Sequence, residues 1–300
     1  MKTENISHAQ NCMRVVTGMR TCVYLVLTIA AMSSSLLAQQ YQFQRLNPPG
    51  SAYSFAFGVN NNDVVAGSFT AADGTYEGFI YEGGEYKIVI FPGAVGFTQA
   101  SAINDSNTVA GEFTGSDSLN HGYLLDAEGR YTQYDVASGA STNIYGINNA
   151  GNFTGNTSFQ GETVMGFVNL EGSVTTFTFK TYYTYAFGIN NANETVGYFT
   201  PPPFVKSHGF FRDASGKMTQ IDYPGATTTV CLAINDLEEI TGYYVDGSNV
   251  AHGFLLKNNV FRSAPLPDLA GINNEGVIVG GYTANQANYG YIATPTNSQQ

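Results

Sequence analysis

Tryptophan is absent from this 300-residue chain, and cysteine is nearly so. Two of the three cysteines, Cys12 and Cys22, lie in an N-terminal segment with the features of a leader, which leaves Cys231 without an internal disulfide partner. A chain without disulfides depends on its core for stability. About 260 residues are enough, since a folded domain of that size buries roughly three quarters of its surface.

Basic residues are also scarce, with 12 Lys and Arg against 23 Asp and Glu and a net charge of −11. Beyond residue 38 the counts are nine and 22, and the net charge is −13. Such a surface repels nucleic acid and anionic lipid, so neither is predicted as a partner. We expect the chain to act as a monomer.

Signatures of common catalytic and metal sites are missing as well. The chain has no nucleophile elbow, no H-E-x-x-H helix, no Walker loop and no EF-hand loop. The sequence therefore assigns no catalytic residue, no cofactor and no metal ligand. Residues 116–120 and 246–249 offer oxygen atoms of the kind that bind calcium, but such segments are more often plain turns.

The N-terminus predicts a secretory signal peptide. Arg14 and Arg20 precede the apolar run CVYLVLTIAAM, and the small-residue tail SSSLLAQQ follows it. The apolar run is about half of the roughly 20 residues that a membrane span needs, so no stable span is predicted. With cleavage after Ala38, residues 1–38 are removed and residues 39–300 form one secreted, extracellular or periplasmic domain.

A sixfold internal repeat dominates the remaining chain. Each copy has Gly or Ala, then Ile or Val, then Asn, and a Gly follows that Asn after seven residues. The shared asparagines are Asn60, Asn104, Asn148, Asn190, Asn235 and Asn273. A fixed period of about 44 residues is typical of solenoids, propellers and other arrays.

A second landmark lies ten to twelve residues after the shared Gly, where Gly precedes an aromatic residue in all six copies, as in Gly78-Phe79 and Gly290-Tyr291. Each period contains four short runs rich in Val, Ile, Thr, Tyr and Phe, separated by turn residues, with no helical periodicity. Four strands per period predict one blade of a β-propeller. The predicted fold is therefore all-β: a six-bladed β-propeller of four-stranded antiparallel blades.

The two ends of the chain favour a closed ring. The sixth copy stops after its third strand, near residues 291–293, whereas residues 41–47 precede the first copy and resemble a fourth strand. We predict that this N-terminal strand completes the last blade. A β-solenoid of six stacked units is the alternative fold, but it would not need the borrowed strand.

The repeat resembles the HAF-type repeats of bacterial extracellular proteins. Residues 188–226 carry the pattern most fully, with GINN, VGYF, HGFF and QIDYPGA. The resemblance covers essentially all of the chain after the leader. It implies secretion and no settled activity.

Three sets of polar residues have a structural and a functional interpretation. The six asparagines lie where a first strand turns into a second, where Asn hydrogen-bonds its own backbone. His121, His208 and His252 share one repeat position but belong to blades 2, 4 and 5, which disfavours a shared zinc ion. Asp236, Glu238 and Glu239 cluster on a turn, where solvated charge is the simpler interpretation.

The candidate binding residues lie where the copies differ. Aromatic residues, prolines and isolated cations gather in the loops on the face opposite the Asn turns. Our candidate ligand-binding residues there are Tyr182, Tyr183, Phe204, Lys206 and His208.

The leading hypothesis is a secreted, non-enzymatic module that binds a glycan or another cell-surface component by stacking on aromatic rings. One alternative is an extracellular hydrolase or lyase with an axial active site. The other is a purely structural surface protein.

Overall fold

The computed structural model describes residues 41–296 except Pro265 and Asn285. The predicted signal peptide, with its cleavage position after Ala38, lies outside the described residues. Residues Gln42–Pro295 form one compact unit. All regular elements in the described part of the chain are β-strands, and none of its segments is a helix able to cross a membrane.

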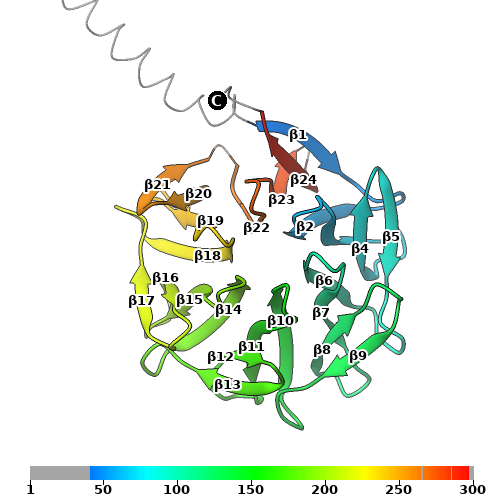
Figure 1. Cartoon of the computed structure of the whole chain (residues 1–300), viewed down its shortest axis with the longest axis horizontal. Helices are drawn as coiled ribbons and strands as arrows, with labels where there is room; N and C mark the ends of the chain where they lie inside the picture. The colour runs from blue at the N-terminus through cyan, green and yellow to red at the C-terminus, as the bar shows by residue number, and fades with distance from the viewer. Residues whose placement is uncertain (1–40, 265, 285, 297–300) are drawn as a thin grey trace, which may run out of the picture. The chain divides into compact units, whose positions relative to one another are not determined.

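Six four-stranded antiparallel sheets form the blades of a β-propeller, which confirms the predicted fold (Figure 1). In blades 1 to 5 the strands follow one another in sequence order from the axis to the rim. In Figure 1 the blades follow one another clockwise around a common axis, from blue to red.

The strands fall into four classes by their place in the blade. The innermost strands are β2 (Tyr53–Val59), β6 (Thr98–Ile103), β10 (Ser141–Ile147), β14 (Tyr183–Ile189), β18 (Thr228–Ile234) and β22 (Gly271–Ile272). The second strands are β3 (Val65–Thr70), β7 (Val109–Thr114), β11 (Phe153–Ser158), β15 (Thr195–Thr200), β19 (Ile240–Val245) and β23 (Ile278–Ala284). The third strands are β4 (Tyr76–Glu82), β8 (Asn120–Leu125), β12 (Met165–Leu170), β16 (His208–Arg212), β20 (Ala251–Lys257) and β24 (Ala287–Pro295). The outer strands are β5 (Glu85–Val89), β9 (Tyr131–Tyr134), β13 (Ser173–Phe177), β17 (Met218–Ile221), β21 (Val260–Ser263) and β1 (Tyr41–Leu46).

The last blade is completed by the N-terminal strand, as the sequence predicts. Its strand order is β1-β24-β23-β22, so the outermost strand comes from the other end of the chain. Leu46 at the end of β1 is fully buried and belongs to a core cluster that spans blades 6 and 1. The borrowed strand therefore ties the two ends of the chain together, which a linear solenoid would not require.

Both repeat landmarks serve the packing inside a blade. The aromatic residue of each Gly-aromatic pair is almost fully buried; the six are Phe79, Tyr123, Phe167, Phe210, Phe254 and Tyr291. Each of these aromatic residues pairs across the sheet with the shared glycine of the second strand. At Gly111 an added Cβ would lie 1.9 Å from the Gln99 carbonyl oxygen and 2.9 Å from the Tyr123 ring. The shared Gly thus allows the close approach of the inner-strand backbone and, at Gly111, of the buried ring.

Replacing Gly111 with Ala is therefore expected to destabilise the fold by about 3 kcal/mol, because the methyl group has to displace backbone or ring. Urea unfolding of the variant and the natural chain measures the difference. Gly247→Ala is the matched control, since a Cβ there meets nothing within 4 Å. Equal losses in the two variants would contradict this explanation of the repeat.

Candidate functional site

The six repeated asparagines cap their own turns. In blade 1 the Oδ1 atom of Asn60 accepts hydrogen bonds from the backbone N–H groups of Asn62 and Val64, both at 3.0 Å. The same pair of bonds, to the second and fourth residues after the asparagine, recurs in the other five blades. The structural interpretation of these asparagines is confirmed.

The same side chains also join each blade to the next. The Nδ2 atom of each asparagine donates to the backbone carbonyl of the equivalent asparagine one blade further, and the last bond runs from Asn273 back to Asn60. The six distances are 3.0 to 3.3 Å. A closed ring of amide bonds therefore surrounds the axis at this end of the propeller.

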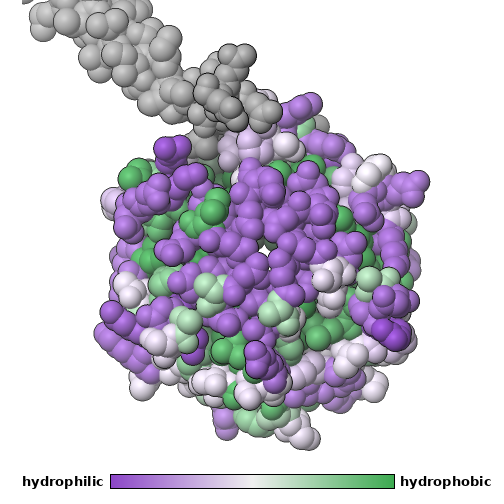
Figure 2. Space-filling model, viewed as in Figure 1, coloured by the Kyte–Doolittle hydropathy of each residue, from purple (hydrophilic) through white to green (hydrophobic). Residues whose placement is uncertain are grey.

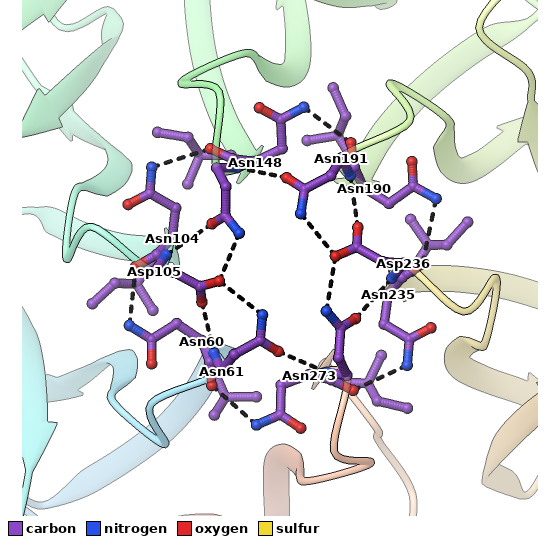
Figure 3. Close-up of a pocket in the computed structure, with 18 residues that line it drawn as sticks. Asn60, Asn61, Asn104, Asp105, Asn148, Asn190, Asn191, Asn235, Asp236 and Asn273 are labelled. Atoms are coloured by element: carbon purple, nitrogen blue, oxygen red, sulfur yellow. Dashed lines mark hydrogen bonds between the residues drawn. The ribbon is translucent and has the colours of Figure 1, made fainter.

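A second ring lies on the residues that follow the repeated asparagines (Figure 3). These are Asn61, Asp105, Asn149, Asn191, Asp236 and Asn274. Each backbone N–H donates to the side-chain oxygen of the next residue in the ring, at 2.8 to 2.9 Å. The six blades are thus linked a second time.

The two aspartates divide this second ring into halves. Asp105 Oδ2 accepts from the Nδ2 atoms of both flanking asparagines, Asn61 at 2.8 Å and Asn149 at 2.6 Å. Asp236 Oδ2 accepts in the same way from Asn191 and Asn274, at 2.7 and 2.8 Å. Each carboxylate therefore holds three neighbouring blades, and the ring has an approximate twofold symmetry.

Within the acidic cluster on the blade 5 turn, Glu238 is exposed, as the solvated-charge interpretation requires, but for Asp236 and Glu239 that interpretation was wrong. Asp236 belongs to the ring just described. Glu239 is buried, with 4% of its surface exposed, and its Oε1 lies 2.5 Å from the Lys257 Nζ. Glu239 Oε2 also accepts a hydrogen bond from Asn235. The sequence pattern missed these contacts because their partners lie on another strand or another blade.

The hollow inside the two rings is small and polar. It measures about 70 Å³, and its lining consists of the ten asparagines, the two aspartates and six aliphatic side chains. Figure 2 shows hydrophilic residues around the centre of the propeller on the side in view. Because the rings use the carboxylate and amide oxygens as acceptors, we assign this end of the axis a structural role.

Asp105→Asn is expected to lower the free energy of unfolding by about 1 kcal/mol at pH 7, because an amide would present N–H groups to two amide donors. Burial alone would raise the pKa of Asp105, but hydrogen bonds from Asn61 and Asn149 outweigh it and lower the pKa. The carboxylate therefore stabilises the fold above its ordinary pKa, and that contribution is lost as the pH falls through the lowered value.

Asp213→Asn is the control for this variant. Asp213 caps an exposed turn through Oδ1 alone, an acceptor that asparagine keeps. Thermal unfolding of both variants at pH 7 makes the comparison, and an Asp105→Asn variant as stable as the control would contradict the assigned role.

The three histidines are each held by a carboxylate of their own blade. His208 Nδ1 lies 2.9 Å from Asp222 Oδ1, and His252 Nε2 lies 2.9 Å from Asp246 Oδ2. His121 lies between Asp117 and Asp135, at 3.1 and 2.8 Å. Burial lowers the pKa of His121, but the two carboxylates outweigh it, so the net shift is upward. The carboxylates of both suggested calcium segments, Asp117 and Asp246, are thus engaged by histidines.

The loops of blade 4 bring some of the predicted binding residues together and separate others. Tyr183 and Phe204 stack at the surface with ring centroids 4.8 Å apart, and Phe204 is half exposed. Tyr182 instead packs against the core cluster of blade 4, and His208 is paired with Asp222. Lys206 is exposed in the loop before β16. Tyr183 and Phe204 therefore form the stacked pair among the predicted residues.

A pocket that the sequence did not predict opens in blade 1, at the end of β2 away from the axial rings. Its volume is about 300 Å³. Five aromatic residues line it, of which Phe69 is largely buried in the core: Tyr53, Phe55, Phe57, Phe69 and Tyr76. The other lining residues are Ser54, Ser68, Thr70 and Asn288, so none of the nine described lining residues carries a charge. The aromatic residues at every second position of β2 are a partial signal, because β14 carries the same pattern and the residues across the sheet also define the pocket.

Contacts with blade 6 hold the pocket wall in place. Ser54 donates to the Leu46 carbonyl at 2.7 Å and accepts from the Gly290 N–H at 3.0 Å. Phe55 lies so close to Gly281 that a Cβ there would be 2.3 Å from its ring. The closure of the propeller therefore also builds this pocket.

A further hollow of about 540 Å³ lies on the rim between blades 4 and 5. Its apolar lining is mainly aliphatic, with Ile221, Leu237, Ile240 and Leu256 beside Phe211. This hollow offers one aromatic ring where the blade 1 pocket offers five.

Glu112 is a buried carboxyl group between blades 2 and 3. Only 5% of its surface is exposed, and its Oε2 has no hydrogen-bond partner within the described residues. Burial raises its pKa to about 8, against the opposing effect of a hydrogen bond with Tyr145. Glycoside hydrolysis uses two carboxyl groups, whereas the group that faces Glu112 here is a tyrosine.

Glu112 gives the stability of the fold a definite pH dependence. The group stays protonated in the folded chain up to about pH 8 but ionises near 4.5 when unfolded. The folded state therefore binds more protons between these values, and stability falls as the pH rises through this window. Glu112→Gln should remove this pH dependence. In urea unfolding, the free energy of unfolding of the variant should therefore rise relative to that of the natural chain between pH 4.5 and 8. Parallel pH profiles would contradict the assignment.

Comparison with known proteins supports the fold. No protein-family model and no curated protein matches the sequence. Among solved structures, the SapL1 lectin in complex with alpha methyl fucoside aligns with a TM-score of 0.55 and 14% identity, covering 82% of this chain and 96% of that one. TolB from Acinetobacter baumannii gives 0.57 at 11% identity, covering 83% of this chain and 65% of that one.

A third solved structure of similar fold is an enzyme. XC5397 from Xanthomonas campestris, described as a gluconolactonase, aligns with a TM-score of 0.53 at 8% identity, covering 82% of this chain and 89% of that one. Identities this low establish a shared propeller fold and leave the activity to be argued from the site.

Proposed function

We propose that this chain is a secreted, non-enzymatic β-propeller that binds a glycan through the blade 1 pocket. The observation that carries the proposal is the pocket's composition: five aromatic side chains with hydroxyl and amide groups beside them. Aromatic faces stack on apolar ligand surfaces, and a few polar groups then fix orientation. Secretion is part of the proposal and rests on the predicted leader and on the HAF-type repeats.

The arrangement of the two ends of the propeller supports this proposal. Extensive hydrogen bonding between blades occupies the polar groups of the axial turns. The opposite end carries the exposed aromatic residues, Tyr53 and Phe204 among them. The SapL1 lectin, with its bound methyl fucoside, shows that a propeller of this size can serve glycan binding.

Tyr53→Ala is expected to weaken glycan binding about tenfold, because it removes an exposed aromatic wall of the pocket. A glycan array identifies a ligand, and calorimetry then compares the variants. Tyr183→Ala is the matched control, since Tyr183 begins β14 as Tyr53 begins β2. If binding is lost in Tyr183→Ala but kept in Tyr53→Ala, the ligand binds at the blade 4 residues instead. An array without any ligand would contradict the proposed function.

A further inference from the structure

Blades 1 and 4 carry nearly the same innermost strand. The strand β2 reads YSFAFGV and β14 reads YTYAFGI, so aromatic residues recur at the same three positions. The two blades lie on opposite sides of the axis in Figure 1. The inner strand alone therefore does not distinguish the two blades.

The second strand distinguishes the two blades. In blade 1, Phe55 pairs with Ser68 across the sheet, whereas in blade 4 the equivalent Tyr185 pairs with Tyr198. Tyr185 and Tyr198 stack with ring centroids 4.7 Å apart and an interplanar angle of 16°. The side chain of Tyr198 therefore takes up space beside the inner strand that Ser68 leaves open in blade 1.

The connecting loops add to this difference. In blade 4 the loop between β15 and β16 places Phe204 on Tyr183. In blade 1 the corresponding loop, residues 71–75, contains no aromatic residue. Tyr53, the counterpart of Tyr183, stays 47% exposed. Tyr183 in blade 4 is thus covered by a side chain of its own blade, while Tyr53 in blade 1 stays exposed.

We propose that blade 1 holds the single monosaccharide site of the propeller, that this site takes an uncharged pyranose ring, and that Ser68 keeps it open. The inference rests on the proposed function and specifies its ligand class. A pocket of about 300 Å³ lies at the small end of ligand sites and suits one sugar ring. The apolar C–H face of the ring stacks on the aromatic wall, and its hydroxyl groups meet Thr70 and Asn288. Ser68 contributes space, since its hydroxyl group already accepts a hydrogen bond from the Ala100 N–H at 3.3 Å.

The pocket's lack of charge sets the ligand class. A uronic or sialic acid would bring a carboxylate among Tyr, Phe, Ser, Thr and Asn side chains, with no cation among the described lining residues to compensate its desolvation. The net charge of the chain, −11, adds long-range repulsion of anions. Binding of a neutral sugar involves neither the desolvation of a carboxylate nor this repulsion.

Calorimetry on the full chain tests the inference. The probes are the uncharged α-methyl glycosides of glucose, galactose, mannose and fucose, with methyl glucuronide as the acidic counterpart of the glucoside. We expect at least one uncharged glycoside to bind with a stoichiometry of one, and the glucuronide to bind at least tenfold more weakly than the glucoside.

Two substitutions at Ser68 separate volume from hydrogen bonding. Ser68→Tyr copies blade 4 and should weaken binding at least tenfold, whereas Ser68→Ala keeps the space and should change affinity less than threefold. Ser68 is buried, so Thr70→Trp at the partly exposed pocket mouth gives a second way to fill the pocket, with the same expected loss.

The outcomes distinguish this inference from the proposed function. Sugar binding that survives both Ser68→Tyr and Thr70→Trp overturns the inference and removes the blade 1 pocket as the site, but it leaves a glycan-binding protein. A stoichiometry of two or more, or a glucuronide that binds as tightly as the glucoside, also overturns the inference, while glycan binding itself remains. Absence of binding by every glycoside, together with an empty glycan array, overturns both.

Discussion

The propeller depends on a repeated asparagine whose side chain makes two kinds of hydrogen bond, one within its turn and one to the next blade. In every blade the asparagine that ends the innermost strand accepts two backbone hydrogen bonds through Oδ1, which forms the turn, and donates through Nδ2 to the next blade, which closes the ring. A shorter or longer polar side chain would lose one of these bonds, and each buried donor left unpaired costs on the order of 1–3 kcal/mol. The same asparagines therefore form the turns and close the ring, and this end of the axis has a structural role.

The opposite end is free to vary because the blades are stabilised elsewhere. Within each blade a glycine on the second strand makes room for a buried aromatic ring on the third, and the outer strands cover that core. The loops beyond these elements differ between the blades, although several add one aromatic side chain to the packing, as Phe91, Phe179 and Tyr223 do. Small changes there decide whether aromatic side chains cover one another, as Tyr185 and Tyr198 do, or line an open pocket, as Phe55 does beside Ser68.

Much of the fold could be predicted from the sequence, but the site could not. The sixfold period, the Asn turns and the missing fourth strand of the last copy predict the number of blades and the closing strand because they are local patterns. The pocket depends on Ser68 standing across the sheet from Phe55 and on blade 6 packing against Phe55 and Ser54, which no single repeat reveals. Aligning blades 1 to 3 with blades 4 to 6 would have helped, since Asp105 matches Asp236 and β2 matches β14.

The two ends of the propeller axis have different roles in this proposal: one end is structural, and at the other end the ligand binds in blade 1. Hydrogen–deuterium exchange of the full chain, with and without a saturating uncharged methyl glycoside, tests it most directly. We expect new protection confined to residues 53–57, 68–76 and 287–290, with the axial turns at 60–64 and 104–108 already protected and unchanged. Protection that appears at the axial turns or in the blade 4 loops, with none in blade 1, would contradict it.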